Sequence, residues 1–198
     1  MVIWINGAFG AGKTTAAYEL HRRLTPSFVY DPEQAGFFLR QNMPQVCRTA
    51  DFQDMALWRT FTYQMLRELH GTYEGTLIVP MTLVNPAYYE EIIQRLTDEG
   101  VPVAHCILCA SRETILKRLR RRNLGMLGRE AFAMEAVERC LAFFDSGVPG
   151  IRIETDRMTV NQIVDRIGEA CALALSPDRR GAMARNMDRL QVAVRHIR

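Results

Sequence analysis

The chain has 198 residues, which is enough for one domain with a sizeable core. Hydrophobic residues make up 48% and charged residues 24%, and a net charge of only +3 does not indicate a nucleic-acid partner. No run approaches the roughly 18 apolar residues of a membrane-spanning helix. The N-terminus lacks a basic stretch followed by an apolar run and a cleavage site, so we expect no secretory signal and a cytoplasmic protein. Five scattered cysteines fit that compartment, because an odd number is not a disulfide framework.

Apolar runs alternate with helical patterns along the chain, which predicts a parallel sheet with helices on both faces. The expected strands are Val2–Asn6, Phe28–Tyr30, Thr76–Val84, Val101–Ala110 and Ile151–Thr155. The expected helices are Gly12–Leu24, one starting at Pro32 or Glu33, Asp54–His70, Pro86–Asp98, one capped by Ser111, and Val160–Cys171. Pro80 limits the third strand and is expected to mark either its carboxyl end or an irregularity in it. Cys106 and Cys109 form a C-x-x-C inside an expected strand, where they point to opposite faces, so we expect structural thiols.

The first loop carries the pattern G-x-x-x-x-G-K-[ST], from Gly7 to Thr14, between an apolar strand and a helix. Its glycines let the backbone fold around phosphate oxygens, and the helix N-terminus adds partial positive charge. Lys13 is expected to reach the β- and γ-phosphates, and Thr14 to ligate Mg²⁺. The sequence therefore predicts binding of ATP with Mg²⁺. The expected nucleotide contacts in this loop are Gly7, Ala8, Phe9, Gly10, Ala11, Gly12, Lys13, Thr14 and Thr15.

Two signatures of other P-loop proteins are missing from the sequence. The sequence has no N-K-x-D, the motif with which GTPases read guanine. The third strand ends in "PMTLVN", without the acidic residue of the Walker B pattern. A carboxylate does follow the second strand, at Asp31. Because ligands bind beyond the carboxyl ends of parallel strands, Asp31 is expected to take a proton from an acceptor hydroxyl or to hold a magnesium-bound water. Asp31 could also simply cap the helix that begins at Pro32, and the two roles are compatible.

A basic helix supplies the third part of the expected site. Lys117–Arg122 leads into a Gly-bearing segment, in which Gly125 and Gly128 could serve as hinges of a short lid. Arg118 and Arg122 share one helical face, and Arg121 neighbours Arg118. Arginines that close over a transferring phosphoryl group lower the barrier, although a solvated basic helix explains any single one of them equally well.

Together these parts resemble the nucleoside-monophosphate kinases and shikimate kinases, over about Met1–Leu175. The resemblance implies a five-stranded parallel sheet in the order 2-3-1-4-5, flanked by helices, with a short lid. It implies that Arg118 stacks on adenine and that Thr155 and Asp156 flank the base. It also implies that Arg121, Arg122 and Arg139 contact the phosphates, Arg121 and Arg139 in a catalytic role beside Lys13 and Asp31.

The chain more closely resembles the bacterial tunicamycin-resistance protein family, in "VIWINGAFGAGKTT", in the "DPE-x-x-G" turn and in "VPMT" at Val79–Thr82. This resemblance implies ATP binding and protection against a uridine-containing, fatty-acyl nucleoside antibiotic. Phosphate transfer to the drug is the expected mechanism. A housekeeping nucleoside or nucleotide kinase, and a protein that sequesters the drug without transfer, are the alternatives.

The segment from Phe28 to Tyr73 is expected to form the acceptor side, because it holds nine of the 17 aromatic residues. Most of these aromatics are explained equally well as helix core. The expected acceptor contacts are Glu33, Gln34, Phe38, Arg40, Arg48, Trp58 and Thr82.

The last 23 residues, Ser176–Arg198, form a separate basic segment after the domain of residues 1–175. They hold six arginines against two aspartates. An apolar stripe at steps of three and four residues predicts an amphipathic helix: Met183, Met187, Leu190, Val194 and Ile197. Such a helix either lies on an anionic membrane surface, at the inner face of the membrane, or docks on its own domain.

Overall fold

The computed structural model describes residues 1–122, 129–181, 183–185, 187, 188 and 192, and only the backbone of 121, 122 and 129–135. Its sheet is parallel throughout, with the strand order β2-β3-β1-β4-β5. The strands are β1 (Val2–Gly7), β2 (Ser27–Val29), β3 (Thr76–Pro80), β4 (Val103–Cys109) and β5 (Ile151–Glu154). The five-stranded parallel sheet and its order are therefore as the resemblance implied, and β3 ends at Pro80 as expected.

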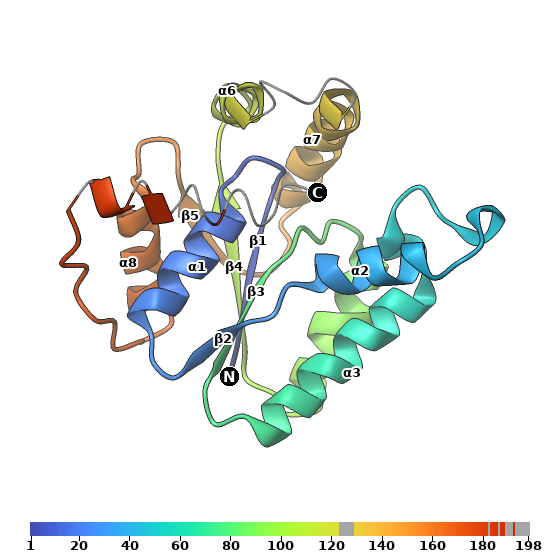
Figure 1. Cartoon of the computed structure of the whole chain (residues 1–198), viewed down its shortest axis with the longest axis horizontal. Helices are drawn as coiled ribbons and strands as arrows, with labels where there is room; N and C mark the ends of the chain where they lie inside the picture. Colours follow the sequence, from blue (N-terminus) through green and yellow to red (C-terminus); the bar gives the residue numbers. More distant parts are fainter. Residues whose placement is uncertain (123–128, 182, 186, 189–191, 193–198) are drawn as a thin grey trace.

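Helices cover both faces of the sheet (Figure 1). They are α1 (Lys13–Arg23), α2 (Pro32–Gln41), α3 (Ala56–Thr72), α4 (Pro86–Tyr89), α5 (Arg95–Asp98), α6 (Arg112–Arg122), α7 (Arg129–Asp145) and α8 (Val160–Ala170), with short turns η1 (Gln45–Cys47) and η2 (Phe52–Asp54). The expected helix over Pro86–Asp98 is present, but its middle, η3 (Glu90–Gln94), winds as a π-helix.

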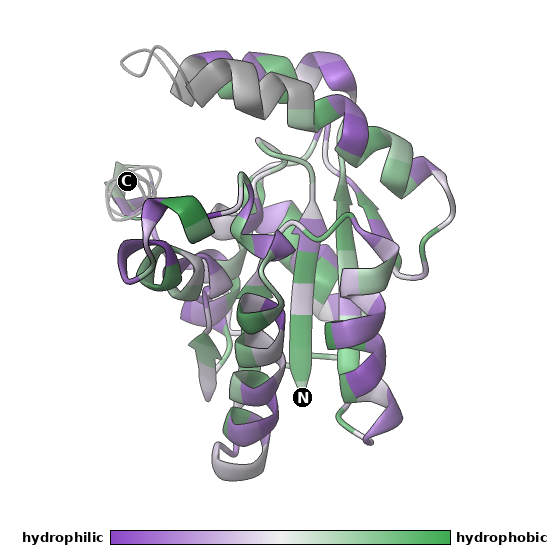
Figure 2. Cartoon of the chain, turned by 90° about the vertical axis from the view of Figure 1, so that its right-hand side faces the viewer, coloured by the Kyte–Doolittle hydropathy of each residue, from purple (hydrophilic) through white to green (hydrophobic). Residues whose placement is uncertain are grey.

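The central strand β1 explains why two cores form. All six of its residues are buried, as in a strand covered on both faces, and its hydrophobic character is visible above the N label in Figure 2. Successive side chains point to opposite faces, so Val2 and Trp4 join the core under α3 while Ile3 and Ile5 join the core under α1 and α8.

A third, smaller core lies where α6 and α7 pack together, above the carboxyl ends of the strands in Figure 1. Ile115 and Leu119 of α6 and Val137 of α7 pack there against Ala8, which belongs to the first loop. This packing brings the basic helix α6 to the loop that the sequence assigns to phosphates. Residues 123–128, where the lid with Gly125 and Gly128 was expected, lie outside the described residues.

All five cysteines are free. Cys106 and Cys109 lie on β4, Cys106 fully buried and Cys109 half-buried, in agreement with the expectation of structural thiols.

An ionic cluster holds the start of the C-terminal segment against α1 and α8. The guanidinium of Arg180 pairs with the buried Glu19 of α1, with Asp178 at 2.7 Å and with Asp188 at 2.6 Å. Asn161 of α8 also donates to Asp178, at 2.7 Å. The hydrogen bond from Arg180 holds the pKa of the Asp178 carboxyl well below its usual range.

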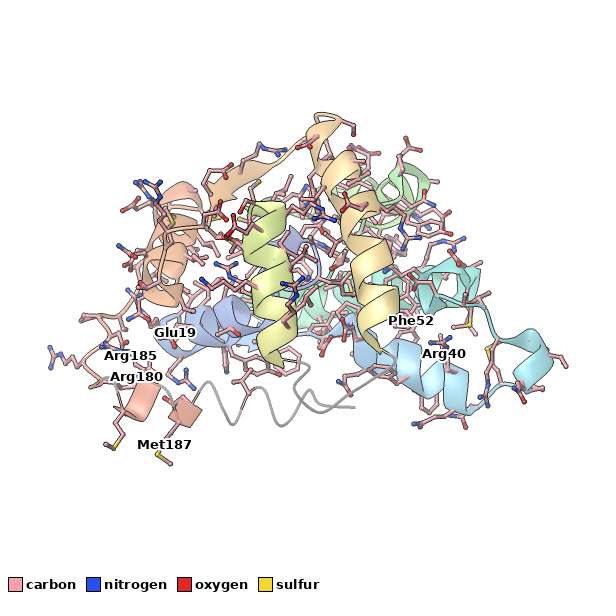
Figure 3. The ribbon with its side chains drawn as sticks, turned by 90° about the horizontal axis from the view of Figure 1, so that it is seen from above. Glu19, Arg40, Phe52, Arg180, Arg185 and Met187 are labelled. Atoms are coloured by element: carbon pink, nitrogen blue, oxygen red, sulfur yellow. The ribbon has the colours of Figure 1, made fainter. Side chains whose placement is uncertain are left out.

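The described part of the predicted apolar stripe faces away from that cluster. Met183 is 80% exposed and Met187 is 59% exposed, and Figure 3 shows Met187 pointing outward while Arg180 and Arg185 lie near Glu19. The polar side of the segment, rather than its apolar stripe, therefore makes these contacts with the domain. Leu190, Val194 and Ile197 lie outside the described residues. In the part of the chain that the structure describes, no helix has the length and apolar character needed to span a bilayer.

We expect Arg180→Ala to lower thermal stability, because it leaves the buried Glu19 carboxylate with Arg22 as its remaining ionic partner. Leaving a buried polar group short of partners costs about 1–3 kcal/mol, and each kcal/mol lowers the melting temperature of a chain of this size by roughly 2–4 °C. Differential scanning calorimetry measures the shift. Arg179→Ala, at the exposed neighbouring position, is the matched control. Equal melting temperatures for the two variants would show that this cluster does not hold the segment.

Candidate active site

The loop from Gly7 to Thr14 connects β1 to α1, and its glycines have conformations that other residues adopt with strain. Gly12 caps α1 at φ +100°, in the left-handed region. Gly7 passes so close to β4 that a Cβ there would lie 2.8 Å from the carbonyl oxygen of Leu108. The backbone of Gly7 therefore lies directly against the backbone of β4. Gly12 borders open space, since no heavy atom would lie within 4 Å of a Cβ at that position.

The N-terminus of α1 differs from those of α2 and α8. Asp31 caps α2 and Thr159 caps α8 with side-chain oxygens, whereas α1 has no side-chain cap and no acidic residue in its first turn. Among the described residues, therefore, no side chain caps this N-terminus, which is the positive end of the helix dipole. This arrangement fits a phosphate group, and the loop residues fit the predicted nucleoside triphosphate.

Lys13 lies inside the loop. Its side chain is buried, and Nζ donates to the carbonyl oxygens of Gly7 and Ala8, each at 3.1 Å, and lies 5.6 Å from the centre of the Phe9 ring. Thr14 and Thr15 follow in the first turn of α1 and are half-buried. The ammonium group of Lys13 is thus held at the start of the loop, beside Gly7 and Ala8. The hydroxyl oxygen of Thr14 is the kind of ligand that suits Mg²⁺.

Asn6 fixes the position of the loop, although the sequence analysis did not single it out. The side-chain Oδ1 accepts from the backbone N–H groups of Gly7 and Leu83, both at 2.9 Å. The Nδ2 donates to the carbonyl oxygen of Leu83 at 2.8 Å and lies 3.1 Å from Nε2 of His105. A buried amide at the end of an apolar strand, immediately before the loop, was the signal that could have identified it.

Thr82, predicted to contact the acceptor, makes a structural contact with the phosphate loop. Its hydroxyl donates to the carbonyl oxygen of Gly7 at 2.9 Å, and the residue is buried. The side chain therefore braces the phosphate loop, and its predicted contact with an acceptor stays a prediction. Thr82 follows β3, where a Walker B acid would stand, and among the described residues no three His, Cys, Asp or Glu side chains cluster as metal ligands.

Arg118 joins the phosphate loop to the loop after β5. Its guanidinium donates to the carbonyl oxygens of Ala11 at 3.2 Å and Thr155 at 2.9 Å. Burial lowers the pKa of Arg118, and the charge of Asp156 opposes that shift. Asp156 itself accepts from the backbone N–H of Ser111 at 2.8 Å, and this bond lowers its pKa. The structure thus brings Arg118, Thr155 and Asp156 together, and their contact with a nucleotide base stays a prediction.

The other predicted arginines are less well defined. Arg121 and Arg122 end α6, and their side chains lie outside the described residues. Arg139 is exposed on α7. Burial raises the pKa of the Asp51 carboxyl, and the hydrogen bond from the Gln53 N–H and the charges of Arg139 and Arg40 oppose this shift.

Asp31 stands at the end of β2, where it caps α2 through a 3.1 Å hydrogen bond from the N–H of Glu33 to Oδ1. Gln34 donates to its Oδ2 at 3.4 Å. Asp31, Gln34 and Phe38 line a groove of about 800 Å³ that opens between α1 and α2. The capping role considered for Asp31 is therefore present, and the carboxylate still borders the groove.

Three residues predicted to contact the acceptor lie outside the lining of this groove. Trp58 is fully buried in the core between α3 and the sheet. Its indole N–H donates to the carbonyl oxygen of Pro32 at 2.9 Å, which ties α3 to the first turn of α2. Arg40 donates to the carbonyl oxygens of Thr49 and Ala50, at 2.8 and 2.9 Å, and Figure 3 shows it on α2 near Phe52. Arg48 donates to Met43 and is exposed. Neither arginine lines the groove.

A parallel sheet in this order, with a glycine-rich loop between β1 and α1, defines a P-loop protein with a nucleoside-monophosphate-kinase-like fold. It is a kinase-like, ATP-binding protein. Residues 2–146 match the family described as AAA domain, and the chain belongs to that family. No curated protein matches the sequence.

Solved structures resemble this fold over most of the chain. The tunicamycin resistance protein of Deinococcus radiodurans is 29% identical, with a TM-score of 0.70 over 89% of this chain and 98% of that one. A sugar kinase from Janibacter is 18% identical (TM-score 0.60, 87% and 95% covered). A shikimate kinase from Bacteroides thetaiotaomicron is 21% identical (TM-score 0.56, 87% and 99% covered). The resemblance inferred from the motifs is confirmed, and the last two likenesses show the fold alone.

We expect Arg118→Ala to weaken nucleotide binding roughly tenfold, because it frees the two loops that the guanidinium joins. Isothermal titration with a non-hydrolysable ATP analogue measures this affinity. Arg120→Ala, on the exposed side of the same helix, is the matched control and is expected to bind normally. If Arg118→Ala also binds normally, the residue takes no part in the nucleotide site.

Proposed function

We propose that this chain is an ATP-dependent phosphotransferase that protects against tunicamycin by phosphorylating it. The observation that carries the proposal is the groove of about 800 Å³ that Asp31 lines, just after β2 in a parallel sheet whose strand β1 leads into the phosphate loop. The similarity to a protein named for tunicamycin resistance supports the choice of acceptor.

In this proposal the loop of Gly7–Thr15 holds the triphosphate of ATP, Lys13 neutralises its terminal phosphates, and Arg118, Thr155 and Asp156 border the base. Bound Mg²⁺, with Thr14 as its protein ligand, would supply charge neutralisation at the phosphates. Arg139, and Arg121 and Arg122 at the end of α6, are proposed to stabilise charge on the transferring group.

Asp31 is proposed to act as the general base. It takes the proton of an acceptor hydroxyl as that oxygen bonds to the γ-phosphorus of ATP. The bond between the γ-phosphorus and the bridging oxygen breaks, and ADP leaves with the bonding electrons. Gln34, hydrogen-bonded to Asp31, and Glu33 are proposed to orient the acceptor, and Phe38 to line its site.

One observation favours a second candidate. The segment "PMTLVN" at the end of β3 holds no acidic residue where the Walker B acid usually stands, which suits a protein that binds the drug and ATP without transfer. Incubation with ATP, Mg²⁺ and tunicamycin, followed by mass spectrometry, separates the two. A drug product heavier by one phosphoryl group is the expected result. Tight drug binding without product would instead establish sequestration. Turnover of ordinary nucleosides but not of the drug would establish a housekeeping kinase.

We expect Asp31→Asn to lower the rate of transfer roughly 100-fold or more, while ATP affinity stays within a few-fold. Asparagine keeps an oxygen that can cap α2, so the variant removes the base and preserves the helix start. Single-turnover transfer and titration with an ATP analogue measure the two quantities. Asp98→Asn, on the surface of α5, is the control for loss of a carboxylate. Unchanged transfer in Asp31→Asn would remove Asp31 from the mechanism.

We also propose that residues 176–198 form a basic amphipathic segment, separate from the domain of residues 1–175, that contacts an anionic membrane surface. The exposure of Met183 and Met187 supports this, because the side chains that would enter the lipid interface are uncovered while Arg180 is engaged with the domain. Flotation with vesicles of phosphatidylglycerol and phosphatidylcholine is expected to carry the full chain and not a chain truncated at Ser176. If both chains stay in the aqueous fraction, the segment contacts only its own domain and not the membrane.

A further inference from the structure

Two thiols from distant parts of the chain meet inside the core under α1 and α8. Cys106 of β4 is fully buried, and its Sγ lies 3.8 Å from the Sγ of Cys171, which follows it by 65 positions and ends α8. Both side chains belong to the same core, and both are free. At this separation a small shift of either side chain brings the two sulfur atoms to bonding distance.

The other cysteine of the C-x-x-C lies on the opposite face of the strand. Cys109 packs with the smaller core at α6 and α7, and its thiol donates to the carbonyl oxygen of Ile107 at 3.6 Å. Positions three apart on a strand point to opposite faces, so β4 itself separates Cys109 from Cys106. The spacing in the sequence therefore indicates one pair of thiols, while the fold brings together another.

The turn after α8 holds Cys171 beside β4. Ala172 adopts a left-handed conformation with φ +52°, which residues other than glycine adopt at a cost in energy. In this turn the N–H of Leu173 donates to the carbonyl oxygen of Gly168 at 2.8 Å, and the bond closes the end of the helix. Leu175 then packs over Gly168, where a Cβ would lie 2.5 Å from its Cδ1. The backbone on both sides of Cys171 is thus fixed.

The two thiols differ in access and in acidity. Cys171 is half-buried and Cys106 is fully buried, so a small oxidant reaches Cys171 first. The hydrogen bond from Cys106 lowers the pKa of Cys171, although burial opposes this shift. The same hydrogen bond and burial raise the pKa of Cys106. Cys171 is therefore the thiol that ionises and reacts first, and Cys106 is the thiol placed to resolve the product.

We propose that Cys106 and Cys171 form a reversible disulfide when the protein meets a hydroperoxide. The Cys171 thiolate attacks the peroxide and becomes a sulfenic acid, while the O–O bond breaks and the departing hydroxide takes up the proton that Cys171 had lost. Cys106 then attacks the oxidised sulfur, the S–S bond forms, and the hydroxyl group leaves with the Cys106 proton as water. Two thiols and one hydrogen peroxide give one disulfide and two molecules of water. This redox site is independent of the proposed phosphotransferase activity.

The disulfide would join an inner strand of the sheet to the end of α8, across 65 positions of the chain. A cross-link over such a distance restricts the unfolded chain and so stabilises the folded one. The C-terminal segment begins a few residues later, where the N–H of Ser176 donates to the carbonyl oxygen of Arg23 at 2.8 Å. Oxidation would therefore fasten the part of the domain from which this segment continues.

Peroxide treatment of the full chain carrying Cys47→Ser tests the inference, because this substitution removes the exposed thiol that would otherwise link two chains. The remaining thiols are blocked with N-ethylmaleimide before tryptic digestion. Tandem mass spectrometry is expected to find the peptides Leu96–Arg112 and Ile167–Arg179 joined through Cys106 and Cys171. The melting temperature is expected to rise by roughly 5 °C or more, and dithiothreitol is expected to reverse both changes.

Cys109→Ala in the same background is the matched control and is expected to keep the cross-link and the rise in melting temperature. Cys171→Ala is expected to lose both, with ATP-analogue binding intact as evidence of folding. A bond between Cys106 and Cys109, or oxidation of Cys171 to a sulfinic acid without a cross-link, would overturn the proposed pair. An equal yield of the same cross-link in the urea-unfolded chain would show that the fold does not prepare it. A cross-link that leaves the melting temperature unchanged would overturn the stabilising role.

Discussion

The side-chain amide of Asn6 is the constraint on which the rest of the site depends. A phosphate loop is a stretch of backbone with little side-chain volume of its own, so neighbouring groups must hold its first residue in place. Asn6 does so with one oxygen that accepts from Gly7 and Leu83, and one nitrogen that donates to Leu83. The loop is thereby tied to the segment after β3, from which Thr82 adds a second bond to Gly7.

The same amide fixes the state of His105. Since Oδ1 of Asn6 is occupied by two N–H groups, its Nδ2 must face the imidazole, and Nε2 of His105 must accept. The ring proton then lies on Nδ1, which donates to the carbonyl oxygen of Pro149 at 2.7 Å. Burial also lowers the pKa of His105, which favours the neutral ring. Strands β1 and β4 and the turn before β5 are thus joined beneath the phosphate loop by one neutral chain of hydrogen bonds.

The sequence predicted the fold and the phosphate loop because both depend on local patterns. Short apolar runs between helical repeats indicate parallel strands, and the glycines and Lys13 of the loop have a fixed spacing. The direction of side chains such as Trp58 and Arg40 could not be predicted in this way. Helical spacing places Trp58 on an apolar face but does not tell which apolar face meets the sheet and which meets a groove. Arg40 donates to the carbonyl oxygens of Thr49 and Ala50, and the position of these two oxygens depends on how the chain turns after α2.

The C-terminal segment shows a related limit. Its period predicted an apolar stripe, and the helix was expected to lie on a membrane or to dock on its own domain. In the described part of the segment, Arg180 pairs with Glu19, a carboxylate buried on α1. A single acidic residue in the middle of an otherwise ordinary helix carries no pattern, so the ionic contact between positions 161 residues apart required the structure.

The two edge strands are short, and this has a consequence for how the protein behaves at high concentration. β2 has three residues and follows Pro26, which has no N–H to offer, while β5 has four, of which Arg152 and Glu154 are exposed. Neither edge offers a long row of unpaired backbone groups to another chain. The sheet therefore resists extension by a neighbouring copy, and crowding is not expected to convert the native protein into strand-paired aggregates, even with aromatic side chains exposed beside β2.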